Sequence, residues 1–241
     1  MPEAHISVSG LRIGYDGQEV VHGISFAVRH GEFVSIVGQS GCGKSSLLHA
    51  LAGFIDKSGD VQVPSDIGMV FQNYAVFPWL TVRGNIAFGL RNCQAESRKD
   101  IVLRHLEMIG LERAASKYPF QLSGGQVQRV ALARALAPDP DAIFMDEPFG
   151  ALDMFTRERM QKWLLGVWEK ESKTVLFVTH NIEEAIFLSD RVIVLGDGII
   201  LGEFPIHLER PRAEQVKFER EFTELKREIL LNMERDNLAQ N

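Results

Sequence analysis

The sequence predicts an α/β fold with a mainly parallel sheet, an N-terminal antiparallel β part and an inserted helical lobe. Short apolar runs without alternation are typical of parallel strands buried on both faces, and three occur here: FVSIVG, AIFMDEP and TVLFVTH. Helical patterns lie between these runs. Near the N-terminus, HISVSGLRIGY and VVHGISFAV are rich in β-branched residues and flank the turn-like DGQ, which predicts antiparallel strands.

The middle and the end of the chain predict helical and hairpin segments. Between roughly Asn85 and Tyr118 the strand patterns disappear, and the amphipathic segment IVLRHLEMIGL indicates a helical lobe. RVIVLGDGIILGEF predicts a hairpin that turns at Asp197–Gly198, where a turn outweighs any catalytic role for Asp197. From Arg212 onward, apolar residues recur at helical spacing and predict a terminal helix packed on the core: Phe218, Phe222, Leu225, Ile229 and Met233.

The length and composition of the chain indicate how many domains it forms and which classes of partner it can bind. With 241 residues, 45% of them hydrophobic and 24% charged, the chain can bury a sizeable core. We expect a single domain over residues 1–241, in three parts: an α/β core at 1–84 and 136–211, a helical lobe at 85–135, and a C-terminal extension at 212–241. The net charge is −6 and the lysines and arginines are scattered, so nucleic acid is not an expected partner.

The cellular location is predicted from the cysteines and from apolar segments. Cys42 and Cys93 have no metal-type spacing and suit a reducing compartment without disulfides. No apolar stretch approaches the ~20 residues of a transmembrane helix, and MPEAHISVSG lacks the basic and apolar regions of a signal peptide. We therefore expect a cytoplasmic protein whose role at a membrane comes through a partner.

The segment GQSGCGKSS, Gly38 to Ser46, lies between the apolar run FVSIV and the helical pattern SLLHALAGF. Its spacing, with Gly43, Lys44 and Ser45 after four intervening residues, is that of a P-loop. In such a loop backbone N–H groups surround phosphate oxygens, the lysine neutralises them, and the serine can ligate Mg²⁺. A glycine-rich turn that only opens a helix is the structural alternative, which the full spacing disfavours. Cys42 is then a loop filler and not a nucleophile.

A second, acidic element ends another predicted buried strand. Asp146 and Glu147 close the run AIFMDEP, at the sheet edge where ligands gather in open α/β folds. Asp146 can hold the Mg²⁺ shell, and Glu147 can orient a water for in-line attack on a γ-phosphate. An acidic pair that only closes a strand before Pro148 would explain these residues in isolation, but not beside a P-loop.

The segment LSGGQVQRVALARALA is the third signal. Ser123 and Gln126 have the spacing of a capping box, which accounts for these two residues but not for Gly124 and Gly125 between them. Consecutive glycines weaken the first turn of a helix unless bare N–H groups must face something. A helix start with a free hydroxyl and open amides is a site for an anion.

These three segments together resemble the nucleotide-binding subunit of ATP-binding cassette (ABC) transporters, and the resemblance covers nearly the whole chain. LSGGQ is the signature of that family, and its combination with GQSGCGKS and AIFMDEP in this order is highly specific. The resemblance implies that Ser123 and Gly125 close over ATP held by the P-loop of a second copy. The active site would then be shared between two chains.

The resemblance also assigns residues that the pattern alone leaves open. Tyr15 in LRIGYDG matches the aromatic residue that stacks on adenine, and Gln72 in MVFQNY matches the Q-loop glutamine that senses Mg²⁺ and the attacking water. Asp153 in GALD matches the D-loop, and His180 in VLFVTHN matches the switch histidine that contacts the γ-phosphate. Without the family, Tyr15 would be a half-buried strand residue as readily, and Gln72 would be an ordinary polar residue after a strand. A lone histidine is usually structural, but His180 lies where an apolar strand ends and a helix begins, at the edge where ligands gather.

The expected site residues form three groups. The catalytic residues are Lys44, Gln72, Glu147 and His180. The Mg²⁺ ligands are Ser45, Gln72 and Asp146. The residues that bind the nucleotide are Tyr15, Gly38, Gln39, Ser40, Gly41, Cys42, Gly43, Lys44, Ser45, Ser46, Gln72, Ser123, Gly124, Gly125, Gln126, Asp146, Asp153 and His180.

Three longer segments resemble importers of the nitrate, sulfonate and taurine type: VFPWLTV, KYPFQLSGGQ and TVLFVTHNIEEAIFLSDRVIVL. In the family, the stretch after the Q-loop lines a groove for a short cytoplasmic helix of the permease. This implies a docking role for the residues 77–80, FPWL, with a buried aromatic cluster as the alternative. Four residues depart from the common pattern without removing a catalytic group: Ser46, Gly84, Val127 and Asn181.

We therefore expect an ATP-hydrolysing subunit that closes as a homodimer on two MgATP and powers a permease at the cytoplasmic face of the cell membrane. The resemblance implies import of a small anion or organic solute of the nitrate, sulfonate and taurine type, with an extracytoplasmic solute-binding protein in the same system. A soluble ABC ATPase of DNA repair or translation is the main alternative, but the sequence shows no coiled coil, second cassette or basic surface. A P-loop metabolite kinase, the third alternative, has no use for LSGGQ.

Overall fold

The computed structural model describes residues 4–90 and 94–239, and the contacts within the chain group it into two compact units. The first unit is Met1–Ser65 with Ser172–Asn241, and the second is Asp66–Glu171. Cys93 lies outside the described residues. In the part of the chain that the structure describes, no helix is long and apolar enough to cross a membrane.

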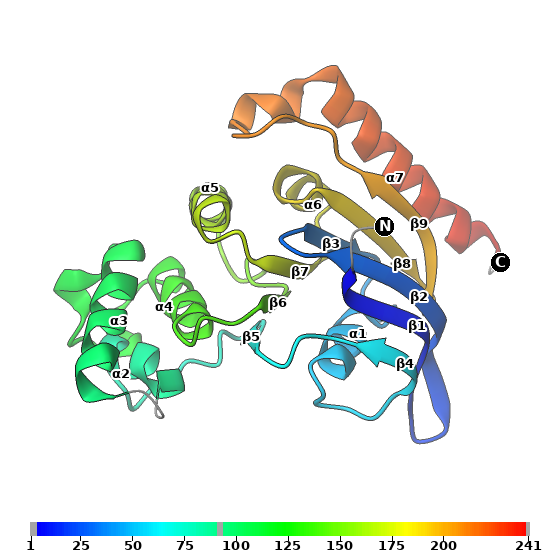
Figure 1. Cartoon of the computed structure of the whole chain (residues 1–241). Coiled ribbons are helices and arrows are strands. Elements are labelled where there is room, and N and C mark those ends of the chain that lie inside the picture. Colours follow the sequence, from blue (N-terminus) through cyan, green and yellow to red (C-terminus); the bar gives the residue numbers. More distant parts are fainter. Residues whose placement is uncertain (1–3, 91–93, 240–241) are drawn as a thin grey trace. The chain divides into compact units, whose positions relative to one another are not determined.

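The first unit begins with the predicted antiparallel strands. β1 (Ala4–Tyr15) and β2 (Gln18–Arg29) pair around a tight turn, and β4 (Ser58–Gln62) pairs with the other edge of β1 (Figure 1). Alternate side chains of β2 are buried, which is the burial pattern of a strand with one face on the core. The antiparallel part of the predicted fold is therefore confirmed.

The same unit holds a parallel group of strands. β3 (Phe33–Val37) lies between β7 (Thr174–Thr179) and β8 (Arg191–Gly196) and is parallel to both. Every residue of β3 and β7 is buried, which explains why their sequences show no alternation. β9 (Ile199–Pro205) returns antiparallel to β8 through Asp197 and Gly198, whose φ angles of 39° and 73° are those of the predicted hairpin turn.

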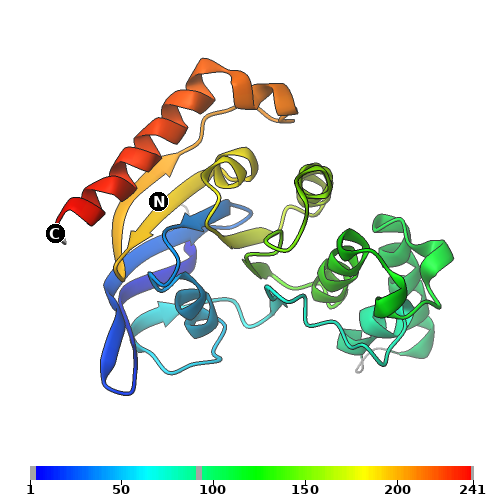
Figure 2. The ribbon, with the colours of Figure 1, turned by 180° about the vertical axis from the view of Figure 1, so that it is seen from behind.

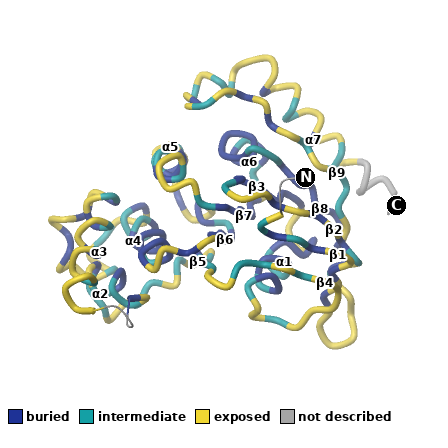
Figure 3. Tube along the Cα trace, in the orientation of Figure 1, coloured by how far each residue is buried: buried dark blue, intermediate teal, exposed yellow. Residues whose placement is uncertain are grey.

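Three α-helices belong to the described residues of this unit: α1 (Lys44–Leu51), α6 (Ile182–Leu188) and α7 (Arg220–Ala239). Helix α7 lies beside β9 and α6, as both ribbon views show (Figures 1 and 2). Over residues 220–234 it buries Phe222 and Ile229, and most of the other residues are exposed (Figure 3). The predicted terminal helix is present and packs on the core.

One residue of the predicted terminal helix is placed differently. Phe218 ends a short 3₁₀ helix (Glu214–Phe218), and its side chain is 87% exposed. Glu219 then has extended backbone dihedrals, and α7 begins only at Arg220. Because the helix is interrupted there, the periodicity that places Phe222 and Ile229 on the core does not extend back to Phe218. The expectation of a helix from about Arg212, with Phe218 on its buried face, was wrong.

The second unit pairs two parallel strands, β5 (Ile67–Val70) and β6 (Ala142–Asp146), and contains the helical segments that the sequence predicts. The helices are α2 (Val82–Ala87), α3 (Ala95–Met108), α4 (Gly124–Leu136) and α5 (Met154–Glu171). No strand occurs in the described residues between 85 and 118. An apolar cluster joins α2, α3 and α4 and includes Ile86, Leu106 and Val130.

Candidate functional site

The P-loop connects β3 to α1 with a backbone that only glycine adopts easily. Gly41 and Gly43 have φ angles of 86° and 100°, in the left-handed region. A Cβ atom on Gly38 would lie 2.1 Å from the carbonyl oxygen of Leu195. The glycines are therefore required by the conformation and packing of the loop itself, in addition to any requirement for close approach of a phosphate.

Lys44 is the first residue of α1, yet its side chain folds back into the loop. It is 4% exposed, and its Nζ donates hydrogen bonds to the carbonyl oxygens of Gly38 at 2.9 Å and Gln39 at 2.6 Å. Neither carbonyl carries a full negative charge, so this buried ammonium suits an anionic ligand. Burial raises the pKa of the neighbouring Cys42 thiol, which supports the prediction that Cys42 is not a nucleophile.

Two other predicted residues of the first unit are accessible. Tyr15, at the end of β1, is 44% exposed, and its hydroxyl donates to Oγ of Ser46 in α1 at 3.2 Å. This bond orients the Tyr15 ring beside the P-loop helix. His180 follows β7 directly and is exposed. Gln39 and Ser40 are exposed at the tip of the loop.

In the second unit, Asp146 ends β6 and is 4% exposed. The next residue, Glu147, has a φ angle of 42°, a conformation that is uncommon for a residue with a side chain. Nε2 of Gln72 donates to Oε2 of Glu147 at 3.5 Å, so the structure brings these two predicted residues together. Strained backbone of this kind is frequent at functional sites, where the surrounding structure holds it.

The signature segment forms the predicted capping box at the start of α4. Ser123 Oγ accepts from the backbone N–H of Gln126 at 3.4 Å, and Oε1 of Gln126 accepts from the Ser123 N–H at 3.0 Å. Helix α4 begins with Gly124, which is exposed, and Gly125, which is buried, so its first two residues carry no side chain. The capping box that Ser123 and Gln126 predict is therefore present in the structure.

Gly125 has a packing reason that the sequence did not show. A Cβ atom there would lie 2.8 Å from Cγ2 of Thr156 in α5. We expect Gly125→Ala to lower the free energy of unfolding by about 1–3 kcal/mol, because it overpacks this contact. Adding Thr156→Ser, which removes Cγ2, should restore the melting temperature. If Gly125 also faces a nucleotide, the double variant stays impaired in ATP hydrolysis, whereas full recovery of both would assign Gly125 to packing alone.

Asp153, the predicted D-loop residue, caps the start of α5. Its Oδ1 accepts from the backbone N–H of Thr156 at 3.0 Å. Hydrogen bonding with the side chain and the backbone N–H of Thr156 lowers the pKa of the Asp153 carboxyl. The side chain therefore has a structural role in this chain whatever it contacts on a second copy.

The residues after Gln72 form an ordered surface, which we call the docking loop, residues 77–81. Asn85, fully buried, holds it: its Oδ1 accepts from the N–H of Phe77, and its Nδ2 donates to the carbonyls of Phe77, Leu80 and Thr81. Trp79 is 69% exposed and contacts the Phe77 ring at a centroid distance of 5.4 Å. The aromatic group is therefore not a fully buried cluster.

Beside the docking loop is a groove of about 500 Å³, lined by Phe71, Ala75, Phe77, Phe88, Arg134 and Pro138 among others. Arg134, in the last turn of α4, donates to the carbonyls of Ala75 at 2.5 Å and Tyr74 at 3.1 Å. Both of those residues have positive φ angles, 60° for Tyr74 and 44° for Ala75. The guanidinium also lies 5.2 Å from the centre of the Phe77 ring.

Asn85 and Arg134 were not singled out from the sequence. Thr81 caps α2 by accepting from the Gly84 N–H. Nothing in the local sequence pattern shows that Asn85 binds four backbone groups. Arg134 stands in a helical pattern where an arginine is usually exposed. Their partners are contacts that only the folded chain reveals.

The comparison with protein families decides the assignment. The family model described as "ABC transporter" matches residues 21–150, more than half of the chain. The chain belongs to the ABC transporter family. It is an ATP-binding, ATP-hydrolysing cassette, and its α/β fold and family resemblance are thereby confirmed.

Curated relatives support the importer resemblance of this ABC cassette. It is 41% identical over 218 residues to the taurine import ATP-binding protein TauB of Escherichia coli O157:H7, covering 85% of this chain and 86% of TauB. It is 39% identical over 237 residues to a putative ATP-binding protein of Brucella abortus (strain 2308), covering 93% and 91% of the two chains.

Solved structures agree with the fold of the cassette. A dimeric bacterial ABC transporter cassette superposes with a TM-score of 0.75 at 34% identity, covering 85% of this chain and all of the other. A dimeric post-hydrolysis state of an ATP-binding cassette, bound to ADP and phosphate, superposes with a TM-score of 0.74 at 32% identity. The second structure also covers 85% of this chain and all of its own chain.

Proposed function

We propose that this cassette is the ATPase subunit of an importer for a small anion or organic solute of the taurine, sulfonate and nitrate type. The similarity to TauB over 85% of the chain supports the substrate class. On this proposal the subunit acts at the cytoplasmic face of the membrane through a permease, with an extracytoplasmic solute-binding protein delivering the solute.

The nucleotide would be held by the P-loop amides and by the Lys44 ammonium, with the Tyr15 ring against the adenine. Mg²⁺ prefers oxygen ligands and usually combines one or two protein groups with substrate phosphates and water. The donor set proposed for it fits: the Ser45 hydroxyl, the Gln72 amide oxygen and the Asp146 carboxylate. No cluster of three or more His, Cys, Asp or Glu occurs in the residues that the structure describes. Bound Mg²⁺ would neutralise phosphate charge.

Hydrolysis would depend on the carboxylate of Glu147, which orients and polarises the attacking water. Gln72 contacts that carboxylate at 3.5 Å and is placed to sense the same water. His180 would contact the γ-phosphate. The described geometry supports each role separately: Lys44 is buried and cationic, Glu147 is held by a local contact, and His180 is accessible.

A second copy would complete the site. The first turn of α4, with the Ser123 hydroxyl and the amides of Gly124 and Gly125, would close over the γ-phosphate on the partner's P-loop. The dimeric state of the similar bacterial cassette supports this arrangement. Hydrolysis would then reopen the dimer.

The observation that carries the proposal of a permease partner is the exposure of Trp79 on an ordered loop beside an apolar groove. Asn85 fixes that loop through its backbone, so the exposed ring is presented by a rigid support. Aromatic anchors on rigid surfaces next to grooves are typical of helix-in-groove recognition. We propose a short cytoplasmic helix of the permease as the occupant.

Replacement of Trp79 by alanine tests this function. Because the ring is 69% exposed, we expect Trp79→Ala to leave MgATP binding and the melting temperature nearly unchanged. Loss of an interface anchor costs ~2 kcal/mol or more, so the affinity for the permease should fall about 30-fold and transport should fall with it. Melting, recovery of the complex and solute uptake are measured on the same variant.

The matched control is Phe54→Ala, which removes another exposed aromatic ring, 58% exposed in the first unit. It should retain both the complex and transport. Full recovery of the permease complex with Trp79→Ala would place the docking surface elsewhere. If the intact wild-type system takes up neither sulfonates, taurine nor nitrate, the proposed substrate class is wrong.

A further inference from the structure

Helix α6 directly follows the switch residue His180 and is only seven residues long. Its start is tied to the end of β7 on both sides of His180. Oδ1 of Asn181 accepts from the Glu184 N–H at 3.1 Å, and Oγ1 of Thr179 donates to Oε2 of Glu184 at 2.5 Å. A displacement of α6 would therefore move the backbone that carries His180.

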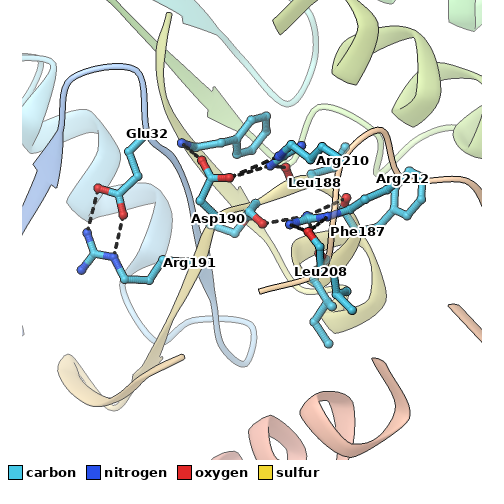
Figure 4. Close-up of polar contacts among 12 residues, drawn as sticks. Glu32, Phe187, Leu188, Asp190, Arg191, Leu208, Arg210 and Arg212 are labelled. Atoms are coloured by element: carbon cyan, nitrogen blue, oxygen red, sulfur yellow. Dashed lines mark hydrogen bonds and ion pairs between the residues drawn. The ribbon is translucent and has the colours of Figure 1, made fainter. Parts of the chain in front are cut away.

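The other end of α6 is held by a buried arginine from the C-terminal segment. Arg212 is 6% exposed, and its Nη1 donates to the carbonyl oxygens of Ile186 at 2.9 Å, Phe187 at 3.0 Å and Ser189 at 2.7 Å (Figure 4). The last carbonyls of a helix have no partner within the helix and carry partial negative charge. The Arg212 guanidinium donates hydrogen bonds to these carbonyls, and its positive charge is attracted to their partial negative charge. It also donates to the Leu208 carbonyl, which joins its own segment to the contact.

A second arginine ties the same segment to β3, the strand that leads into the P-loop. Arg210 Nη2 donates to Oδ1 of Asp190 at 2.8 Å and to the Leu188 carbonyl at 2.9 Å. The other oxygen of Asp190 accepts from the Phe33 N–H at 2.9 Å (Figure 4). The position of α6 is thus set relative to the start of β3.

Helix α7 contacts the first half of α6. Lys226 Nζ lies 2.5 Å from Oε1 of Glu183, three residues after His180, and this pair is partly exposed. Lys217, just before α7, lies over the Phe187 ring at 4.7 Å. Phe222 and Ile229 anchor α7 on the core, at 1% and 0% exposure. Contacts from the C-terminal segment therefore reach both the first turn and the last turn of α6.

We propose that residues 206–239, which we call the C-terminal brace, position His180 for hydrolysis by fixing α6 at both ends. Arg212 and Lys226 are positioning residues in this arrangement. A two-turn helix has little stability of its own, so its placement depends on such contacts. The inference rests on the proposed role of His180 and gives the C-terminal extension a part in catalysis beyond packing.

The test compares variants of the brace by steady-state ATP hydrolysis of the full-length protein. Lys226→Met removes a partly exposed ion pair, and we expect kcat to fall about 3-fold, with KM for MgATP within about 2-fold of wild type. Lys226→Arg keeps the charge and should restore kcat. Arg212→Met leaves several helix-end carbonyls without their donor, and we expect kcat to fall about 10-fold or more.

Two controls separate positioning from a general loss of stability. Arg220→Met removes the exposed pair with Glu224 within α7, where no contact to α6 is involved, and should keep kcat at the wild-type value. All rates are measured at least about 10 °C below the melting temperature of each variant and are normalised to MgATP-binding sites, so that unfolded protein does not contribute. A role in stability alone would change the melting temperature but not this kcat.

His180→Ala distinguishes failure of the inference from failure of the proposed function. Wild-type turnover in His180→Ala would overturn the role of His180 and with it the basis of the brace. If His180→Ala is inactive but Lys226→Met and Arg212→Met keep wild-type kcat, the brace is wrong while the function stands. A fall of kcat in Lys226→Met that Lys226→Arg shares would also contradict the brace, because the charge would then be irrelevant.

Discussion

Lys44→Ala is expected to abolish ATP hydrolysis and to weaken MgATP binding strongly while the protein remains folded. The Lys44 ammonium is buried inside the P-loop on the carbonyls of Gly38 and Gln39, where the phosphates of the proposed nucleotide would bind. Removing a cation that contacts the transferred phosphoryl group lowers turnover by about 10³-fold or more. Phosphate release measures ATP hydrolysis, titration with a fluorescent ATP analogue measures nucleotide affinity, and thermal melting shows whether the protein is folded.

The matched control for this variant is Lys57→Ala. Lys57 Nζ also donates to a backbone carbonyl, that of Ala50 at 2.5 Å, but in the last turn of α1, away from the P-loop. It should retain turnover close to that of wild type. Wild-type turnover in Lys44→Ala would contradict the P-loop assignment, whereas loss of turnover in both variants would indicate damage to α1.

Glu147→Gln should bind MgATP, fail to hydrolyse it and hold two copies together. The amide has the shape of the carboxylate and can keep a contact with Gln72, but it cannot accept a proton from the water. We expect kcat to fall about 10²–10⁴-fold with little change in MgATP affinity. Size-exclusion chromatography with light scattering in MgATP reports the dimer. Glu169→Gln, an exposed glutamate of α5, is the control and should behave as wild type.

The same experiment tests the shared site through Ser123. Adding Ser123→Arg to Glu147→Gln places a long cation at the start of α4, where the partner's γ-phosphate would lie, and should prevent the dimer. A monomeric Glu147→Gln protein in MgATP would contradict the shared-site model. So would a dimer that persists with the arginine present.

The buried strands were predictable because their chemistry is local. In β3 and β7 every residue is buried, so the sequence itself shows short, largely apolar runs without alternation, broken only by Ser35 and by the threonines at the two ends of β7. Strand β4, SGDVQ, was not predicted, because its residues are mostly exposed and polar and only its pairing with β1 makes it a strand. Phe218 shows the opposite error: helical spacing continued in the sequence, while the backbone at Glu219 broke the helix.

The candidate site divides in the same way. The P-loop and the signature are contiguous motifs whose spacing carries their geometry, so the sequence indicates them directly. Arg134 and Arg212 act through carbonyls distant in the chain, 59 residues away for Ala75 and 26 for Ile186. No local pattern distinguishes such an arginine from one on a solvated helix face. Gly125 belongs to both groups of residues. The signature motif identifies it from the sequence, but its packing against Thr156 is visible only in the folded chain.

Helix α4 has a mechanical consequence for coupling. Its 13 residues extend about 20 Å, with the Ser123 cap at one end and, in the last turn, the Arg134 side chain that grips the backbone before the docking loop. On the proposed shared site, a tilt of this helix toward a partner's nucleotide would also move Arg134 and, through it, the carbonyls of Tyr74 and Ala75. On the proposed function, one rigid helix would then join the contact with the nucleotide to the contact with the permease, and no relay of side-chain rearrangements between them would be required.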